Sequence, residues 1–427
     1  MQITGFPYFP GVVVGRLHVG SEGDTAERIL LLSQEQAARL GTLPAGIIVV
    51  DAMPFSHTMI GVLGLGVPTV LITAQQAAML PAAAGELLID GSRGVITTDV
   101  SRPPPARVLR PNPEAGQPVL LADGQAVALS ASVRQPSMAK QARALGAESI
   151  GLVRSEFLLP ADDVQPGVEF FLNAFRSICE AASPLPVTFR LLDLAPDKMP
   201  PWLTKLDLAG QTTGMQGVRS YHLEPVRAVV QAQVSALAAL ADEFPLRVLL
   251  PYLVRLEEYD YWLQVVRRWL PGTVAVGAMA ETLAMVLDIE HVLADADFVA
   301  IGCNDLMQNI YMADRDQANL RDYLDPYAPV LFRLFRQVAE AAGEQIDRVL
   351  LCGVLPQIQG VMPVMLGLGY RHFSVDAPFI PHLANAISTL TATECRALSR
   401  QVCDARETIE VVEILQVATD RHAPFIS

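Results

Sequence analysis

Polar and nucleophilic side chains recur in or just after short apolar runs in the second half of this chain. They are Arg154, Glu156, Arg190, Asp193, Glu281, Asn304, Asp305 and Cys352. Only 18% of the residues are charged, and an ionic group beside an apolar run is costly unless it is paired or bound to a ligand. Any one of these residues could be an ion-pair partner at the rim of the fold. Together they fit a substrate site better.

The types of these residues indicate what such a site would bind. Glu281 and Asp305 follow neighbouring runs, and their carboxylates could give Mg²⁺ two oxygen ligands while leaving positions for substrate and water. Arg154, Arg190 and Arg315 supply planar guanidinium groups that suit phosphate or carboxylate. A divalent cation beside three arginines implies a small, highly anionic substrate.

The elements that must position these residues are buried parallel strands. Apolar runs of four to six residues alternate with stretches of helical period, which is the pattern of βα units. The runs are 127–130, 150–154, 187–192, 247–251, 274–278, 298–302, 349–353 and 372–375. Eight such strands predict an α/β protein with a (β/α)₈ barrel, whose chemistry lies just past the carboxyl ends of the strands.

The N-terminal quarter of the chain has a different organisation. Residues 1–100 contain short β-like runs and a helical stretch after Ser56, which predicts a small α/β domain. The runs are 11–17, 29–32, 46–50, 69–72, 86–89 and 94–97. Residues 101–118 hold six prolines and predict an extended linker. We therefore expect a domain over 1–100, a proline-rich linker over 101–118 and the barrel over 119–427.

Composition narrows the partners and the compartment. The net charge of −14, without a cluster of Lys and Arg, argues against binding to nucleic acid. The five cysteines form no CxxC pair, which favours a reducing cytoplasm over a disulfide framework or a zinc site. The first residues lack the features of a signal peptide, and the apolar runs are too short to span a bilayer. We expect a cytoplasmic protein without membrane insertion.

Six strings in the second half of the chain resemble a known family. They are GAESIGLVRSEFLL, FRLLDLAPDKMP, GAMAETLAM, AIGCNDLMQNIYMADRD, LCG and GLGYRHFSVDAPFIP. In this order they resemble the barrel of the phosphoenolpyruvate-utilising enzymes, and most closely Enzyme I of the sugar phosphotransferase system. The resemblance runs from about residue 120 to 400.

The resemblance implies a role for each matching residue. Arg154, Arg190 and Arg315 match arginines that hold phosphoenolpyruvate, and Asn304 matches an asparagine that binds its phosphate. Glu281 and Asp305 match the magnesium ligands, and Cys352 matches the acid that protonates the enolate carbon. Without the motif, a buried cysteine after a strand would be read as a small apolar residue.

The N-terminal region carries a second resemblance. GIIVVDAMPFSHTMIGVLGLGVPTVLIT, residues 46–73, is similar to the phosphohistidine loop of the same family, and His57 is the matching histidine. Imidazole is a nucleophile at neutral pH, which suits it to accept a phosphoryl group. A lone histidine would ordinarily have no chemical role, and the motif is what favours catalysis here. The resemblance implies a swivelling domain that carries the phosphoryl group.

The chain also departs from the family pattern. Only about 25 residues separate the first strand from the loop region, so we expect the helical domain that docks the carrier protein HPr to be missing. Phe55 replaces a threonine before the histidine, Leu63 replaces an arginine after it, and Gln216 replaces an arginine in the barrel. Val354 replaces the glutamate after Cys-Gly. These changes touch positions that face the substrate, and we expect them to affect rate or specificity.

Three hypotheses follow for the function. The first is magnesium-dependent transfer of the phosphoryl group of phosphoenolpyruvate to His57, with release of pyruvate, and then to an unidentified protein or small molecule. The second is one half of a split synthase or dikinase whose nucleotide-binding partner is a separate chain. The third is a degenerate paralogue that binds phosphoenolpyruvate or pyruvate as a regulator. By analogy, and because residues 355–370 are apolar, we also expect a homodimer through the barrel.

Overall fold

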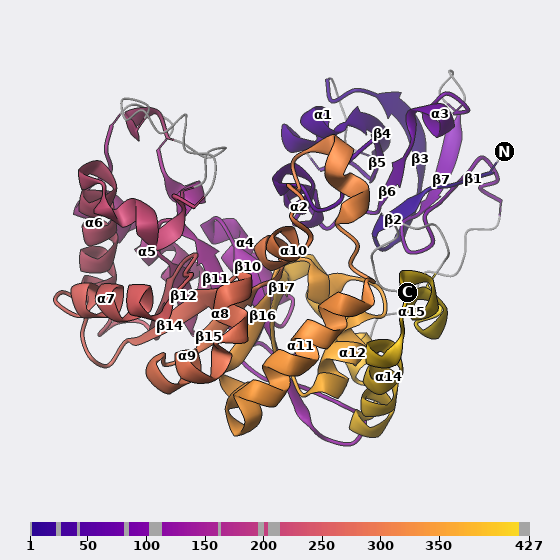
Figure 1. Ribbon diagram of the computed structural model, residues 1–427. Coiled ribbons are helices and arrows are strands. Elements are labelled where there is room, and N and C mark those ends of the chain that lie inside the picture. The colour runs from indigo at the N-terminus through magenta and orange to yellow at the C-terminus, as the bar shows by residue number, and fades with distance from the viewer. Residues whose placement is uncertain are drawn as a thin grey trace.

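A computed structural model describes residues 2–22, 27–40, 43–80, 85–101, 113–160, 164–194, 200–203 and 214–417 (Figure 1). Its strands form two separate sheets, one built from residues 2–97 and the other from residues 119–376. Most of the proline-rich segment, 102–112, lies outside the described residues, as do Asp197 and Lys198 of the FRLLDLAPDKMP string. The expected domain limits therefore remain a prediction.

The second sheet is a closed parallel barrel, as the apolar runs predict. Neighbouring strands pair in parallel from β11 through β17, and β10 pairs with both β17 and β11 to close the ring. The strands are β10 (Ala126–Val133), β11 (Ile150–Arg154), β12 (Val187–Arg190), β13 (Leu246–Leu250), β14 (Ala275–Ala280), β15 (Val299–Gly302), β16 (Val349–Cys352) and β17 (His372–Asp376). The short β9 (Val119–Leu120) runs antiparallel to β10 and lies outside the ring.

Helices surround this ring of strands (Figure 1). They are α4 (Pro136–Ala144), α5 (Val168–Ala182), α6 (Glu224–Leu240), α7 (Leu256–Val266), α8 (Leu283–Leu287), α9 (Ile289–Asp295), α10 (Cys303–Tyr311), α11 (Pro329–Ala342), α12 (Val361–Leu368), α13 (Ile380–Ile387), α14 (Ala392–Asp404) and α15 (Thr408–Ile414). Short 3₁₀ segments also occur. Two of them, η1 (Ser155–Leu158) and η8 (Ala377–Phe379), directly follow β11 and β17, whereas η4 (Gly217–His222) precedes α6 and η5 (Ala318–Tyr323) follows α10. The barrel core is almost wholly apolar, which is why its strands read as continuous apolar runs.

The first sheet has eight strands in the order β1-β8-β7-β3-β4-β5-β6-β2. They are β1 (Gln2–Thr4), β2 (Phe6–Phe9), β3 (Val12–Val19), β4 (Arg28–Ser33), β5 (Gly46–Val50), β6 (Thr69–Ile72), β7 (Glu86–Asp90) and β8 (Val95–Thr97). Three short helices accompany them, α1 (Gln34–Ala38), α2 (His57–Leu63) and α3 (Ala74–Ala77). We call residues 2–97 the N-terminal unit.

The N-terminal unit packs on the end of the barrel where the strands terminate (Figure 1). The ring of Phe9 meets that of Phe379 edge to face, with centroids 4.8 Å apart. A Cβ on Gly66 would lie 3.0 Å from the Cβ of Pro378, and one on Gly64 would lie 3.3 Å from Cε of Met138. Helix α2 and the loop after it therefore lie against the segments that follow β10 and β17.

The apolar run at 355–370 is buried within a single chain. Val361, Met362, Val364, Met365 and Leu366 of α12 are all at most 3% exposed, and α12 packs against α14. The hydrophobicity of this run thus has an explanation inside one protomer, so it does not support a dimer. In the part of the chain that the structure describes, no helix is long and apolar enough to cross a membrane.

Candidate active site

The predicted barrel residues converge at the carboxyl ends of the strands. Arg154, Arg190 and Cys352 are the last residues of β11, β12 and β16. Glu281 follows β14 directly, and Asn304 and Asp305 lie in the first turn of α10, after β15. Parallel strands bring these ends to one rim, which we call the mouth of the barrel. Arg315 follows α10, and His57 belongs to the N-terminal unit.

Arg190 is the centre of a buried ionic cluster. Its side chain is 5% exposed and donates to Oε1 of Glu156 at 2.5 Å and to Oδ2 of Asp193 at 2.9 Å. Burial alone would lower the pKa of Arg190, but Asp193 and Glu156 outweigh it and raise that pKa above its usual value. The guanidinium is therefore fixed in position and in charge, although Glu156 and Asp193 already occupy part of its donor set.

Glu281 is fully buried next to glycine at position 302. Its Oε1 accepts a hydrogen bond from the backbone N–H of Tyr252 at 2.9 Å. Burial raises the pKa of Glu281 well above its usual value, and the nearby carboxylates of Asp305 and Asp193 add to the shift. A Cβ on Gly302 would lie 2.5 Å from Oε2 of Glu281, so only glycine leaves room for this carboxylate.

Asp305 shares its carboxylate with Arg315. Nη2 of Arg315 lies 3.1 Å from Oδ1 of Asp305, and the arginine side chain is 7% exposed. The amide of Asn309 donates to the backbone oxygens of Asp305 at 2.8 Å and of Glu281 at 3.3 Å. Asn309 thus fixes the backbone of both acidic residues relative to each other.

Asn304 is held by the turn that follows Cys352. Its Oδ1 accepts the backbone N–H of Val354 at 3.0 Å. Gly353 has φ = +107°, and a Cβ there would lie 2.8 Å from Oδ1 of Asn304, so this turn requires glycine. Because Val354 contributes its backbone to this contact, replacement of the family glutamate by valine leaves the contact with Asn304 intact.

Cys352 faces the interior of the barrel. It packs in a small apolar cluster with Leu152, Leu249 and Met279, and its thiol donates to the carbonyl oxygen of Ile301 at 3.3 Å. Burial raises the pKa of Cys352 to about 12, and the charge of Glu281 contributes. A thiol with this pKa keeps its proton at neutral pH and can donate it, whereas a reactive thiolate needs a lowered pKa.

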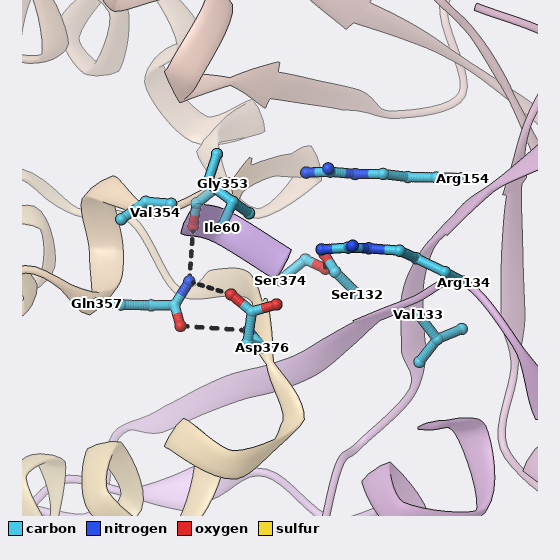
Figure 2. Close-up of a pocket in the computed structure, with 10 residues that line it drawn as sticks. All are labelled: Ile60, Ser132, Val133, Arg134, Arg154, Gly353, Val354, Gln357, Ser374 and Asp376. Carbon is cyan, nitrogen blue, oxygen red and sulfur yellow. Dashed lines mark hydrogen bonds between the residues drawn. The ribbon is translucent and has the colours of Figure 1, made fainter. Parts of the chain in front are cut away.

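A pocket opens beside these residues between the barrel and helix α2 (Figure 2). We call it the mouth pocket. It is lined by Ile60, Ser132, Val133, Arg134, Arg154, Gly353, Val354, Gln357, Ser374 and Asp376. Figure 2 shows the guanidinium groups of Arg134 and Arg154 side by side, both directed into the pocket. Gln357 donates to Oδ2 of Asp376 at 3.1 Å and accepts from the backbone N–H of Asp376 at 3.3 Å.

His57 is the first residue of α2. The hydroxyl of Ser56 caps this helix by accepting the N–H of Met59 at 3.3 Å. Residues three and four apart share a helix face, which places position 57 on the same face as Ile60 and Gly61. Ile60 lines the mouth pocket. The backbone therefore puts position 57 on the helix face that is turned to the barrel.

The departures from the family pattern fall into different surroundings. Leu63 is fully buried in the apolar core, so α2 carries no basic residue in its last turn. Phe55 is partly buried against the same core. Gln216 caps η4 without a side-chain bond to it, and nearby Arg219 pairs with Glu258 at 2.8 Å. The structure gives no reason for the threonine-to-phenylalanine change at position 55.

The donor set fits a hard divalent cation in part. Within the described residues no group of three or more His, Cys, Asp and Glu side chains is arranged to hold a metal ion. However, Oε2 of Glu281 is buried and finds no hydrogen-bond partner among those residues. Glu281 is thus a buried carboxylate with an unsatisfied oxygen and with other carboxylates nearby. These are properties of a Mg²⁺ ligand in a site where substrate and water supply the remaining oxygens.

Two residues of the mouth pocket escaped the sequence-based prediction. Arg134 and Asp376 lie at the ends of β10 and β17, where polar residues are expected to act. The predicted runs ended at residues 130 and 375, short of both. Extending each run to the next charged side chain would have found them.

A closed parallel barrel with paired arginines and carboxylates at the strand ends defines an α/β-barrel enzyme for a small anionic substrate. The family described as "PEP-utilising enzyme, PEP-binding domain" matches residues 112–392, which is more than half of the chain. The chain therefore belongs to the family of phosphoenolpyruvate-utilising enzymes. Its barrel is the part that the family match covers.

Several relatives of known name resemble this chain. The phosphoenolpyruvate-protein phosphotransferase of Streptomyces coelicolor is 30% identical over 379 residues, which cover 86% of this chain and 67% of the relative. That of Staphylococcus carnosus is 28% identical over 70% of this chain and 53% of its own length. Multiphosphoryl transfer protein 1 of Escherichia coli K12 is 27% identical over 70% of this chain, which spans only 37% of that relative.

Proposed function

We propose that this chain is a phosphotransferase that moves the phosphoryl group of phosphoenolpyruvate to His57 and releases pyruvate. The observation that carries the proposal is the position of α2. This helix begins at His57, and its Ile60 lines the same pocket as Arg154 at the mouth of the barrel. A nucleophile on that helix face would approach a substrate held by the barrel arginines. The names of the relatives support the same reaction.

In this reaction the barrel residues bind and orient the substrate. The fixed guanidinium groups of Arg190 and Arg315, together with Arg154 and the amide of Asn304, would hold the phosphate and carboxylate oxygens. An imidazole nitrogen of His57 forms the new P–N bond while the bond between phosphorus and the enol oxygen breaks. The electron pair of the broken bond remains on the enolate of pyruvate.

Cys352 would complete the first half-reaction. Its thiol remains protonated at neutral pH because burial raises its pKa to about 12. It can therefore give a proton to the methylene carbon of the enolate as a general acid and yield pyruvate. The apolar cluster around Cys352 keeps bulk water away from this step.

Magnesium is the cofactor that we propose. Glu281 and Asp305 would hold it, and the bound ion would neutralise charge that develops on the phosphate and enolate oxygens. The unsatisfied oxygen of Glu281 supports this assignment.

Only eight residues separate β3 from β4. This short connection favours an acceptor that does not dock through a helical insertion at that point.

Mass spectrometry under conditions that preserve phosphohistidine tests the proposal. After incubation with phosphoenolpyruvate and Mg²⁺, the parent and a His18→Ala control should each gain one phosphoryl group, and His57→Ala should gain none. If His57→Ala still formed pyruvate at the parent rate, a reaction confined to the barrel would replace the proposal. If the parent bound phosphoenolpyruvate without gaining phosphate, a regulatory role or a separate phosphorylating partner would be the better explanation.

A further inference from the structure

Arg134, at the mouth of the barrel, makes no ion pair or hydrogen bond within the described residues. It follows β10 directly, and its guanidinium lies beside that of Arg154 (Figure 2). In the part of the chain that the structure describes, neither arginine makes a hydrogen bond or an ion pair. Arg190 and Arg315, by contrast, are both paired with carboxylates. The mouth pocket therefore contains two positive charges that no protein group neutralises by contact.

The surroundings of Arg134 balance its charge only in part. Its guanidinium stacks over the ring of Phe157, 4.9 Å from the centroid. Burial lowers the pKa of Arg134, and the like charge of Arg154 lowers it further, while the more distant carboxylates of Asp376 and Glu156 oppose this shift. Arginine cannot relieve such a position by losing its proton. Two adjacent guanidinium groups with free N–H donors are stabilised by an anion that accepts from both.

Asp376 is the only nearby carboxylate that lines the pocket, among the residues described. It is 5% exposed, and its Oδ2 is engaged by Gln357. Burial raises the pKa of Asp376, while Arg134 opposes this shift. Asp376 attracts Arg134 from a distance but does not bind its N–H groups. Those donors remain available to a ligand.

Arg134 also reaches helix α2. A Cβ on Gly61 would lie 3.3 Å from Nη1 of Arg134. Gly61 is four residues after position 57, and residues with this spacing share a helix face. The guanidinium therefore lies beside that of Arg154 and close to the face of α2 that carries position 57. No basic residue of α2 itself lies in its last turn, where the family resemblance would place an arginine at the position of Leu63.

We propose that Arg134 is a phosphoryl-binding residue that supplies, from the barrel, the positive charge that α2 lacks. This inference rests on the proposed transfer from phosphoenolpyruvate to His57. The N–H groups of Arg134 bind the phosphoryl oxygens while the phosphoryl group passes from the enol oxygen to the imidazole nitrogen of His57. Together with Arg154 it stabilises the charge on those oxygens in the transition state.

Single-turnover phosphorylation by phosphoenolpyruvate and Mg²⁺ tests this role. Arg134→Met should slow the formation of phosphohistidine on the order of 100-fold at saturating substrate. Arg134→Lys should slow it less, because lysine keeps the positive charge although it lacks the planar guanidinium group. Arg400→Met, on the exposed face of α14, is the matched control and should react like the parent. Free guanidinium ion should restore part of the rate to Arg134→Ala.

A double variant separates this role from a merely structural one. If Arg134 served only to balance Asp376, then Asp376→Asn added to Arg134→Met would restore the rate, and that result would overturn the inference. Equal rates for Arg134→Met and Arg400→Met would overturn it as well. In both cases the parent is still phosphorylated. An unphosphorylated parent would instead refute the proposed function itself.

Discussion

Two buried cysteines near one carbonyl oxygen differ in what their thiols face. The thiols of Cys352 and Cys303 lie 3.3 Å and 3.7 Å from the carbonyl oxygen of Ile301. Cys352 belongs to the apolar cluster inside the barrel, next to the side chains of the mouth. Cys303 belongs to the larger core that joins the barrel to its helices. Only Cys352 is placed to meet a substrate bound at the mouth.

We expect Cys352→Ala to slow pyruvate formation by about 100-fold or more, because general acid catalysis contributes about that much. Phosphoryl transfer to His57 should persist, since it needs no proton from Cys352. A coupled assay for pyruvate, run beside a phosphohistidine assay, would measure the two steps. Cys303→Ala is the control and should leave both steps near the parent rate. Equal effects in the two variants would remove Cys352 from the proton-transfer role.

The pKa of Cys352 has a consequence for stability at high pH. Its folded-state value is about 12, whereas its usual value is 9.0. The unfolded chain therefore loses this proton first as the pH rises, and the free energy of unfolding should fall between about pH 9 and pH 12. Urea unfolding of the parent and of Cys352→Ala across this window should show a smaller decline in the variant. Parallel curves would indicate an ordinary pKa for this thiol.

Glu281 and Asp305 should control the response of the protein to magnesium. Glu281→Gln and Asp305→Asn each remove a carboxylate from a site in which substrate completes the shell of oxygen ligands. We expect both variants to lose the magnesium-dependent part of phosphoenolpyruvate binding, measured by calorimetry with and without Mg²⁺. Glu290→Gln, an exposed position on α9, should retain it. Unchanged magnesium dependence in both site variants would place the metal elsewhere.

At the residue scale, the sequence predicted the positions of the site residues better than their partners. Glu281 and Asp305 were expected at neighbouring strand ends because a parallel barrel brings such ends together. The need for glycine at two positions could not be predicted. Position 302 lies against Glu281, and position 353 lies against Asn304. Each requirement comes from a side chain on another strand, and a single sequence does not show which strands will be neighbours.

At the scale of the elements, buried strands were predicted well, and the two edge strands of the first sheet, β1 and β2, were missed. The eight barrel runs were predicted because both faces of a parallel barrel strand are buried and its residues are apolar throughout. Strand β2 contains Pro7, which argues against a strand when only local sequence is considered. In the structure β2 is the edge strand beside β6, and an edge position tolerates proline.

This edge strand anchors the loop that precedes His57. The hydroxyl of Tyr8 in β2 donates to the carbonyl oxygen of Pro54 at 2.9 Å in a fully buried position. Tyr8→Phe should reduce the free energy of unfolding by about 1 kcal/mol and slow phosphorylation of His57 by up to about tenfold, because the loop is less well positioned. Thermal unfolding and the single-turnover assay would measure the two effects.

Tyr259→Phe is a matched control for this prediction. The hydroxyl of Tyr259 also donates to a buried carbonyl oxygen at 2.9 Å, that of Val276, but it lies within the barrel. This variant should lose similar stability and phosphorylate at the parent rate. Slower phosphorylation in both variants would show that general loss of stability is responsible.

At the scale of the whole molecule, exposed apolar side chains lie on other helices than the run at 355–370. Most of that run is buried, and its helix α12 packs against α14. Helix α8 contacts both α10 and α11, and large apolar side chains are exposed on and next to these helices. They are Leu283, Leu287, Met312, Tyr323 and Val330. Exposed apolar side chains on helices that contact one another are typical of protein interfaces.

If the chain forms a homodimer, we expect this surface around α8 to be the interface. Light scattering at micromolar concentration should then give twice the chain mass of 46.1 kDa. Met312 is 87% exposed and Leu287 is 59% exposed. The double variant Leu287→Glu, Met312→Glu would bury two negative charges on each side of the interface. It should therefore have the mass of a single chain. Val19→Glu, on an equally open position of β3 at 74% exposure, should leave the dimer intact. A mass of 46.1 kDa for the parent under these conditions would show that the chain is a monomer. A double variant that remains dimeric would place the interface on another surface.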